Sequence, residues 1–287
     1  MLIFADMIVR FSLLVGLSLL LTACGGDESL SADAPAAATG RPTTTRISLS
    51  AAEAKSIGRK IWVNECGGTV AGLTSWNKGE YFASLGIGHF IWYHAGRRGP
   101  FEESFPPLIR FMQAQGVSGI PAWITPNTKC PWTSREAFLA AKDSPKMREL
   151  RGFLHRTIPT QTAFILQRLE RALPKMLNEV PASERALVKG RFYAVASTAG
   201  GKYALMDYVN FKGEGTNPNE RYKGQGWGML QVLQDMRGKP QGVAAVKEFS
   251  ASAERVLTRR VANAPKKESQ WLAGWKNRAR SYANWKP

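Results

Sequence analysis

The chain has 287 residues, of which 44% are hydrophobic, so it can bury a sizeable core, and this composition argues against global disorder. Its formal net charge of +17 favours an anionic partner. The candidates are nucleic acid, an acidic lipid surface and an anionic cell-wall polymer. Only three histidines are present, which argues against a metal site built from several histidines, and no metal or cofactor is expected.

Residues 1–23 resemble the signal peptide of a bacterial lipoprotein. An apolar run at 11–21 follows Arg10 and is too short to span a bilayer comfortably. It ends in the letters LTAC, which are similar to the box whose cysteine, here Cys24, becomes lipidated and anchors the protein without a transmembrane helix. The next residue, Gly25, is not the Asp that retains such proteins in the inner membrane, so the resemblance implies an outer-membrane protein facing the periplasm. The alternative is an ordinary secretory signal with a chance cysteine.

Export narrows the choice of partner and makes disulfides possible. Nucleic acid becomes a poor candidate, whereas peptidoglycan or another anionic envelope glycan becomes a better one, together with the membrane that holds the lipid anchor. If Cys24 is lipidated, Cys66 and Cys130 remain as an even pair. We expect these two to form a disulfide, with two buried thiols as the alternative.

The composition divides the chain into a tether and one folded domain. Residues 24–47 are rich in Ala, Ser, Thr and Pro without periodicity, and we expect a flexible tether there and a folded domain at 48–287. Aromatic residues and glycines at 82–93 favour strands, and most of the remainder has helical periodicity. The expected helices cover 137–154, 160–177, 186–211, 229–236, 243–262 and 270–282, with Pro106-Pro107 as a break and a Gly-rich loop at 213–228. The expected class is therefore mainly α (α+β), with a small β-hairpin or sheet near the start of the domain.

Glu65 ends the apolar stripe of the first predicted helix. Ser50 and Glu53 have the spacing of a capping box, which predicts that the helix begins at this point. Ala54, Ile57, Gly58, Ile61 and Trp62 then recur at helical spacing, and the stripe continues to Glu65. A carboxylate on the inward face of a helix is a candidate functional group.

The segment after Glu65 carries the residue types that cleavage of a glycosidic bond requires. One carboxylic acid in an apolar setting, with a raised pKa, protonates the leaving oxygen, and a second acid commonly stays ionised as nucleophile or base. Glu65 suits the first role, and Glu80, in a polar turn, suits the second. Gly86 and Gly88 would let the backbone approach a sugar closely, and Trp76 would stack on a sugar face.

These residues resemble the phage-type lysozymes. In that family a glutamate ends the first long helix, and a small sheet with an Asp, a Thr and the motif Gly-x-Gly-His follows. The matching positions here are Glu65, Ser84 in the place of Thr, and Gly86-Ile87-Gly88-His89. Two further stretches are similar to the family: 203–216 to its buried central helix and the turn after it, and 255–263 to a helix that contains Arg-Arg.

The resemblance implies a lysozyme-like domain at 48–287, with a middle insertion at about 96–160 that has no counterpart. Asp207 in the central helix is either a buried, satisfied residue or a substrate-binding residue that faces the cleft. Tyr222 and Trp227 are expected to line the cleft from the Gly-rich loop, and His89 is expected to support the hairpin as a hydrogen-bonding residue.

One departure from the family leaves the function open. Counted back from His89, the family's Asp falls on Lys78, and Glu80 lies two positions away. A muramidase would use Glu65 with Glu80, whereas a lytic transglycosylase would need only Glu65, because the substrate's own hydroxyl attacks. The alternative class is a non-catalytic peptidoglycan-binding or scaffolding lipoprotein, and a fainter one is a lipoprotein whose middle insertion binds a partner protein.

Overall fold

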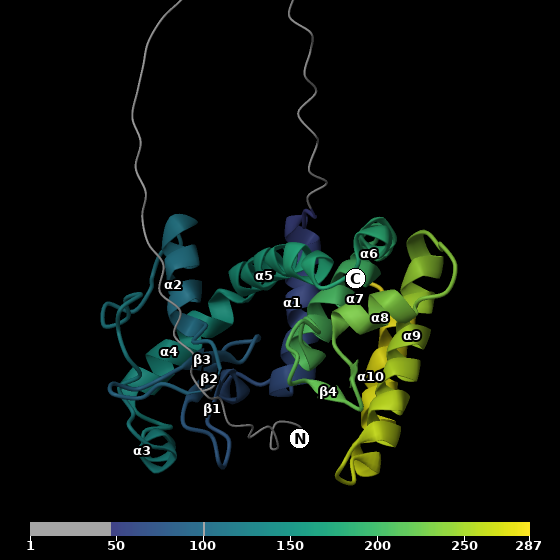
Figure 1. Ribbon diagram of the computed structural model, residues 1–287. Coiled ribbons are helices and arrows are strands. Elements are labelled where there is room, and N and C mark those ends of the chain that lie inside the picture. Colours follow the sequence, from purple (N-terminus) through teal and green to yellow (C-terminus); the bar gives the residue numbers. More distant parts are fainter. Residues whose placement is uncertain (1–46, 100) are drawn as a thin grey trace, which may run out of the picture. The chain divides into compact units, whose positions relative to one another are not determined.

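The computed structural model describes residues 47–99 and 101–287. The expected signal peptide, Cys24 and nearly all of the expected tether lie outside the described residues. The described part is mainly helical with a small antiparallel sheet, so the expected mainly α class is confirmed (Figure 1). Its elements are α1 (Ala51–Cys66), the 3-10 helix η1 (Ala71–Leu73), β1 (Thr74–Ser75), β2 (Ala83–Leu85), β3 (Phe90–Trp92), α2 (Phe105–Ala114), α3 (Arg135–Ala140), α4 (Pro145–Arg156), α5 (Ile158–Asn178), α6 (Ala182–Ala196), α7 (Ala199–Lys212), β4 (Arg221–Tyr222), β5 (Gln225–Gly226), α8 (Met229–Asp235), α9 (Gly242–Asn263) and α10 (Ser269–Asn284). None of the helices in the described ranges is both long and apolar enough to cross a membrane.

Helix α1 begins and ends where the local sequence predicts. The Ser50 hydroxyl accepts a hydrogen bond from the Glu53 amide, and the Glu53 carboxylate accepts one from the Ser50 amide, so the predicted capping box is present. The apolar stripe packs against α5, and the helices approach closely at Gly58, where a Cβ would lie 2.3 Å from Thr162 Oγ1. Gly67 ends the helix in the left-handed conformation, with φ +62°. Glu65 therefore lies in the last turn.

The three-stranded sheet separates two turns that matter for the site. Its order is β1-β2-β3, and both pairs are antiparallel, with Ser75 opposite Ser84 and Ser84 opposite Ile91. The β1–β2 turn (76–82) therefore lies at one end of β2, and the β2–β3 turn (86–89) lies at the other.

The segment between β3 and α5 covers the sheet and shares its core. Trp92 packs against Phe105 with ring centroids 4.7 Å apart, and its indole N–H donates to the Thr128 carbonyl over 2.9 Å. Trp76 meets Phe138 of α3 edge to face at 5.7 Å. The expected insertion at about 96–160 thus belongs to one hydrophobic core with the strands.

Three helix expectations need correction. The expected helix at 137–154 is two helices, because Ser144 caps a new one at Pro145. The expected helix at 186–211 is also two, because the Thr198 hydroxyl accepts from the Gly201 amide and starts α7. Pro106-Pro107 begins α2 rather than breaking a helix, since proline is tolerated in the first turn.

The C-terminal helices surround α7, which is buried along most of its length. Helices α6, α8, α9 and α10 all pack against it, and α9 and α10 lie side by side as a long pair (Figure 1). Helix α1 also packs against α7, which brings the last turn of α1 near the core of this helical group.

Candidate functional site

Glu65 lies where three parts of the fold meet. Its carboxylate forms an ion pair with the guanidinium of Arg278 on α10, and its second oxygen lies 3.9 Å from His89 Nδ1 in the β2–β3 turn. The Glu65 side chain is only 4% exposed. The structure therefore brings the glutamate and the histidine of the predicted motif together and adds an arginine that the sequence reasoning missed.

Asp207 holds that arginine in place from the other side. The Arg278 guanidinium donates to both Asp207 oxygens, over 2.7 and 2.8 Å, and Tyr282 Oη donates to the same carboxylate over 2.6 Å. Asn64 Nδ2 donates to it over 3.2 Å. Burial of Asp207 acts to raise its pKa, but the Arg278 charge and the hydrogen bonds outweigh burial and hold the pKa below its ordinary value. Asp207 is thus the buried, satisfied residue, and it positions Arg278 against Glu65.

His89 adopts an unusual backbone conformation beside Glu65. Its φ is +47°, which a residue with a side chain rarely adopts, and its amide donates to the Gly86 carbonyl to close the turn. Burial lowers the pKa of the His89 imidazole, and the nearby Arg278 lowers it further, although the Glu65 charge acts in the opposite direction. The ring is therefore neutral at pH 7, and its contacts support the expected structural role.

The two glycines of the motif are required by protein packing. A Cβ on Gly86, whose φ is +66°, would lie 2.3 Å from Gln161 Oε1, and that oxygen accepts from the Ile87 amide over 3.0 Å. A Cβ on Gly88 would lie 2.6 Å from the Phe90 ring. The close approaches come from α5 and β3, which differs from the expected approach of a sugar at these positions.

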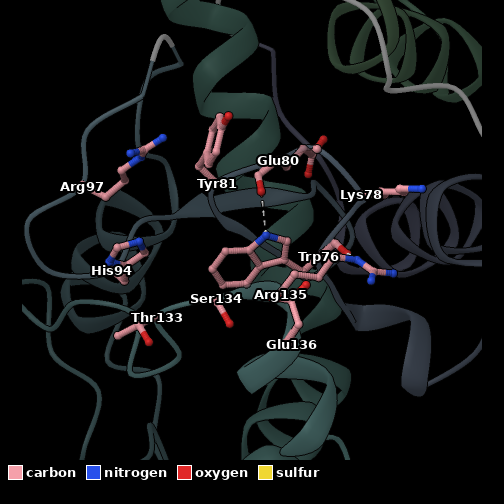
Figure 2. A pocket seen from close by; sticks show the side chains of 11 residues that line it. Trp76, Lys78, Glu80, Tyr81, His94, Arg97, Thr133, Ser134, Arg135 and Glu136 are labelled. Carbon is pink, nitrogen blue, oxygen red and sulfur yellow. Dashed lines mark hydrogen bonds between the residues drawn. The ribbon is translucent and has the colours of Figure 1, made fainter.

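Glu80 and Trp76 lie at the opposite end of the sheet from Glu65. The Trp76 indole N–H donates to the Glu80 carbonyl over 2.9 Å (Figure 2). Asn77 Nδ2 donates to the Glu80 carboxylate over 3.1 Å. Burial raises the pKa of Glu80, opposed by the hydrogen bonds from Asn77. The three residues of β2 alone span about 10 Å. Glu65 and Glu80 therefore do not face one another as a close carboxylate pair.

Ser84 occupies the middle of β2, between the two turns. Its side chain is buried, and its carbonyl accepts from the Ser75 hydroxyl over 3.3 Å. The residue that matches the family's Thr is therefore buried in the middle strand of the sheet.

Tyr222 and Trp227 form a second cluster with α9 and α10. Their ring centroids lie 4.5 Å apart, and the Arg260 guanidinium lies 4.1 Å over the Trp227 ring. Tyr222 Oη donates to Glu268 over 3.0 Å, and Arg260 pairs with the same carboxylate at 2.8 Å. Both aromatic residues therefore belong to a packed ion-pair network, in which Trp227 is buried and Tyr222 is half-buried.

A row of contacts between cations and rings connects this cluster to Glu65. Arg278 lies 4.3 Å from the Phe211 ring centroid, Lys212 Nζ lies 4.2 Å from the same ring and 3.5 Å from the Trp275 ring, and Arg260 lies 4.8 Å from the Trp275 ring. Burial lowers the pKa of Lys212 well below its ordinary range, and the nearby Arg260 adds to this shift. The Glu65 and Tyr222 regions thus lie at the two ends of one row of charged side chains and aromatic rings, which α7, α9 and α10 contribute.

The expected disulfide between Cys66 and Cys130 is not present in the structure, where both are buried free thiols. Cys66 Sγ lies against the Gly86 carbonyl, at the end of the sheet that carries His89. The Cys130 amide donates to the Tyr93 carbonyl beyond the other end of β3. The three residues of β3 span about 10 Å, which exceeds the Cα separation of a disulfide. Burial, aided by the Glu65 charge, raises the pKa of the Cys66 thiol to about 12.

No group of three or more His, Cys, Asp and Glu side chains in the described residues is arranged to hold a metal ion. Comparisons of the chain with known protein families, with curated proteins and with solved structures find no match.

Proposed function

We propose that the protein cleaves the glycan strands of peptidoglycan, with Glu65 as the general acid. The observation that carries the proposal is the 3.9 Å approach of Glu65 and His89, because these are the two residues on which the resemblance to phage-type lysozymes rests. They come from separate elements, the end of α1 and the β2–β3 turn, as that resemblance implies. The same resemblance supports a lysozyme-like fold for residues 48–287.

The chemistry assigns a distinct role to each group. Glu65 leaves its ion pair with Arg278, takes up a proton from solvent and gives that proton to the glycosidic oxygen as the bond breaks, which requires that oxygen to approach its carboxyl within about 3 Å. Arg278 stays in place when Glu65 turns toward the substrate, because Asp207 binds it through two further hydrogen bonds. Asp207 and Arg278 are therefore positioning residues, and His89 packs behind the acid.

The geometry favours a one-acid reaction over a Glu65–Glu80 pair. Two-acid glycosidases hold their carboxyl groups about 5–9.5 Å apart across the scissile bond. Glu80 lies beyond the other end of β2 and bonds to Asn77. A lytic transglycosylase, in which a hydroxyl of the substrate attacks and an anhydro sugar forms, is the reaction that this arrangement supports.

The burial of Glu65 favours one second candidate, a non-catalytic peptidoglycan-binding lipoprotein. The carboxylate is 4% exposed and is engaged by Arg278, so a glycan oxygen reaches it only after the side chain or a neighbour moves. In both cases we infer an envelope protein anchored to the outer membrane by a lipid on Cys24, which fractionation of a Cys24→Ser variant tests.

Digestion of purified peptidoglycan with the full chain, followed by mass spectrometry, tests the proposal. The wild type is expected to release anhydro-ended fragments, and Glu65→Gln should lower the rate by about 10²–10⁴-fold, since Gln cannot donate the proton. Glu80→Gln is the matched carboxylate control and should retain most activity. Reducing ends that depend on both acids would instead indicate a muramidase. If a control muramidase digests the sample and the wild type releases nothing, the enzyme proposal fails and the binding candidate replaces it.

A further inference from the structure

A pocket of about 640 Å³ opens beside the β1–β2 turn, at the end of the sheet away from Glu65 (Figure 2). One wall comes from the turn itself, with Trp76 and Tyr81. The other comes from the segments around His94 and Thr133, in the region between β3 and α5. The pocket therefore lies between the sheet and the region that has no counterpart in the lysozyme resemblance.

The aromatic residues give the pocket an apolar surface. The Trp76 indole lies in the middle of the view in Figure 2, and its residue is buried, so it forms the floor. The Tyr81 ring lies above it and is 58% exposed, although large aromatic side chains usually bury most of their surface. An exposed ring beside a polar pocket can pack against the C–H face of a sugar while the polar groups bind its hydroxyls.

The charges of the pocket favour an anionic group. Arg97 lies over the Tyr81 ring at 4.1 Å, and no carboxylate in the described part of the chain forms an ion pair with it. Lys78 and Arg135 also line the pocket, so its lining carries three cations and the two carboxylates of Glu80 and Glu136. Arg135 donates to the Trp76 carbonyl over 2.9 Å, which leaves Arg97 as the arginine best placed for a ligand. An arginine guanidinium is planar and matches a carboxylate through two parallel hydrogen bonds.

Hydroxyl groups lie on the side of the pocket opposite Tyr81. Thr133 and Ser134 are found below the Trp76 ring in Figure 2, and His94 lies across from that ring. The Ser134 oxygen accepts from the Ala137 amide over 3.1 Å, and its hydroxyl donates to the Glu136 carboxylate, so the Thr133 hydroxyl and the His94 imidazole are the polar groups left for a ligand on this side. The pocket therefore offers an aromatic ring, a guanidinium, a hydroxyl and an imidazole. Together these groups match a polar, cyclic, anionic ligand.

We propose that this pocket binds a sugar unit that carries a carboxylate, with its ring against Tyr81 and its carboxylate on Arg97. The site is separate from Glu65, so it would hold a glycan strand at a second point and orient it along the sheet. The choice of N-acetylmuramic acid as one probe rests on the proposed function, since that sugar carries a lactyl carboxylate. The pocket itself is inferred from its own residues.

Calorimetric titration of the full chain, purified in detergent, tests the proposal with N-acetylmuramic acid and glucuronic acid as acidic sugars and N-acetylglucosamine as the neutral one. The acidic sugars should bind more tightly than the neutral one. Arg97→Ala should weaken their binding by about tenfold, the effect of losing a charge-assisted hydrogen bond. Tyr81→Ala should weaken it as well. Circular dichroism verifies that each variant is folded.

Arg98→Ala is the matched control, because Arg98 is the exposed neighbour of Arg97, lies outside the pocket lining and changes the net charge equally. It should leave affinity within about twofold of the wild type, a change below 0.5 kcal/mol by the ratio of ~1.4 kcal/mol to tenfold. The proposal is overturned if the wild type binds neither acidic sugar, if both arginine variants weaken binding equally, or if inorganic phosphate binds as tightly as the sugars.

The test separates this proposal from the proposed function. Binding that depends on Arg97 in a protein that cleaves no glycan would leave the pocket standing and refute the enzyme. Cleavage without any binding that depends on Arg97 would refute the pocket and leave the enzyme standing.

Discussion

Replacing Arg278 by methionine removes the cation that contacts both carboxylates of the candidate site. Asp207 is fully buried, and the Glu65 side chain is 4% exposed, so the variant leaves two acids without their counter-ion inside the protein. Methionine keeps an apolar stem over the Phe211 ring, so packing is largely preserved. Removal of one partner from a buried ion pair typically destabilises by about 3–5 kcal/mol. That is a large share of the roughly 5–15 kcal/mol that holds a domain folded.

The same variant should show an inverted dependence of stability on pH. In the wild type the folded pKa of Asp207 is lowered, so its contribution is fully present above the unfolded value of about 3.9 and is lost as pH falls through the folded pKa. In Arg278→Met burial of Asp207 acts without the arginine and raises its pKa. Protonation then relieves the buried charge, so the stability lost in the variant should shrink between pH 7 and pH 4.

Urea unfolding followed by circular dichroism at pH 7 and pH 4 measures both effects. Arg280→Met is the control, because Arg280 lies two residues away on α10 and pairs with Glu254 at 2.7 Å, but its side chain is 58% exposed. It should lose less than about 1 kcal/mol at either pH. Equal losses for the two variants at pH 7, or a loss for Arg278→Met that is unchanged at pH 4, would refute the reasoning.

Two further predictions concern the sheet. Gly86→Ala should lower the free energy of unfolding by about 2–4 kcal/mol, because it adds a clash with Gln161 to a strained φ. Gly79→Ala is the control: Gly79 has φ +85° and open space around it, so this variant should lose only about 1 kcal/mol. Similar losses for the two variants would argue against the Gln161 contact. Cys66 and Cys130 should resist alkylation at pH 8 in the native protein, since burial raises both thiol pKa values to about 12, and both should react in urea without reductant. Peptide mass mapping would contradict this if it found the two joined.

Local signals predicted the start of the domain well. The cap at Ser50, the stripe on α1 and the strands after it depend on neighbours within a few residues, and the structure contains them. The helix boundaries at Ser144 and Thr198 were missed although both are N-cap residues, because apolar periodicity continues across them and reads as one helix. A serine or threonine inside a long periodic run was the signal that could have located both breaks.

The candidate site could be predicted only in part. Glu65 and His89 were identified from the order of residues in one segment, but Arg278 lies 213 residues from Glu65 in sequence, and only tertiary packing brings them together. The spacing of Arg278 and Tyr282, four residues apart on one helix face, was the only local sign of their shared partner, Asp207. Gly86 and Gly88 were expected to admit a sugar, whereas protein side chains lie against both, and the one against Gly86 belongs to Gln161, which bonds the Ile87 amide from 74 residues away in sequence.

We propose that the network around Asp207 serves a functional site in addition to stability. Well-packed apolar residues commonly replace a buried ion pair without loss of stability, so the core does not require this one. Here the pair extends through Arg278 to a second acid, and it lies beside a histidine in the left-handed backbone region. Strained residues and ion networks that meet at one place are typical of functional sites. A purely structural role would need only Asp207, Arg278 and Tyr282. The contact from Arg278 to Glu65 adds a second carboxylate, which lies at the end of α1 next to the β2–β3 turn. In the proposed reaction a substrate has to approach this turn.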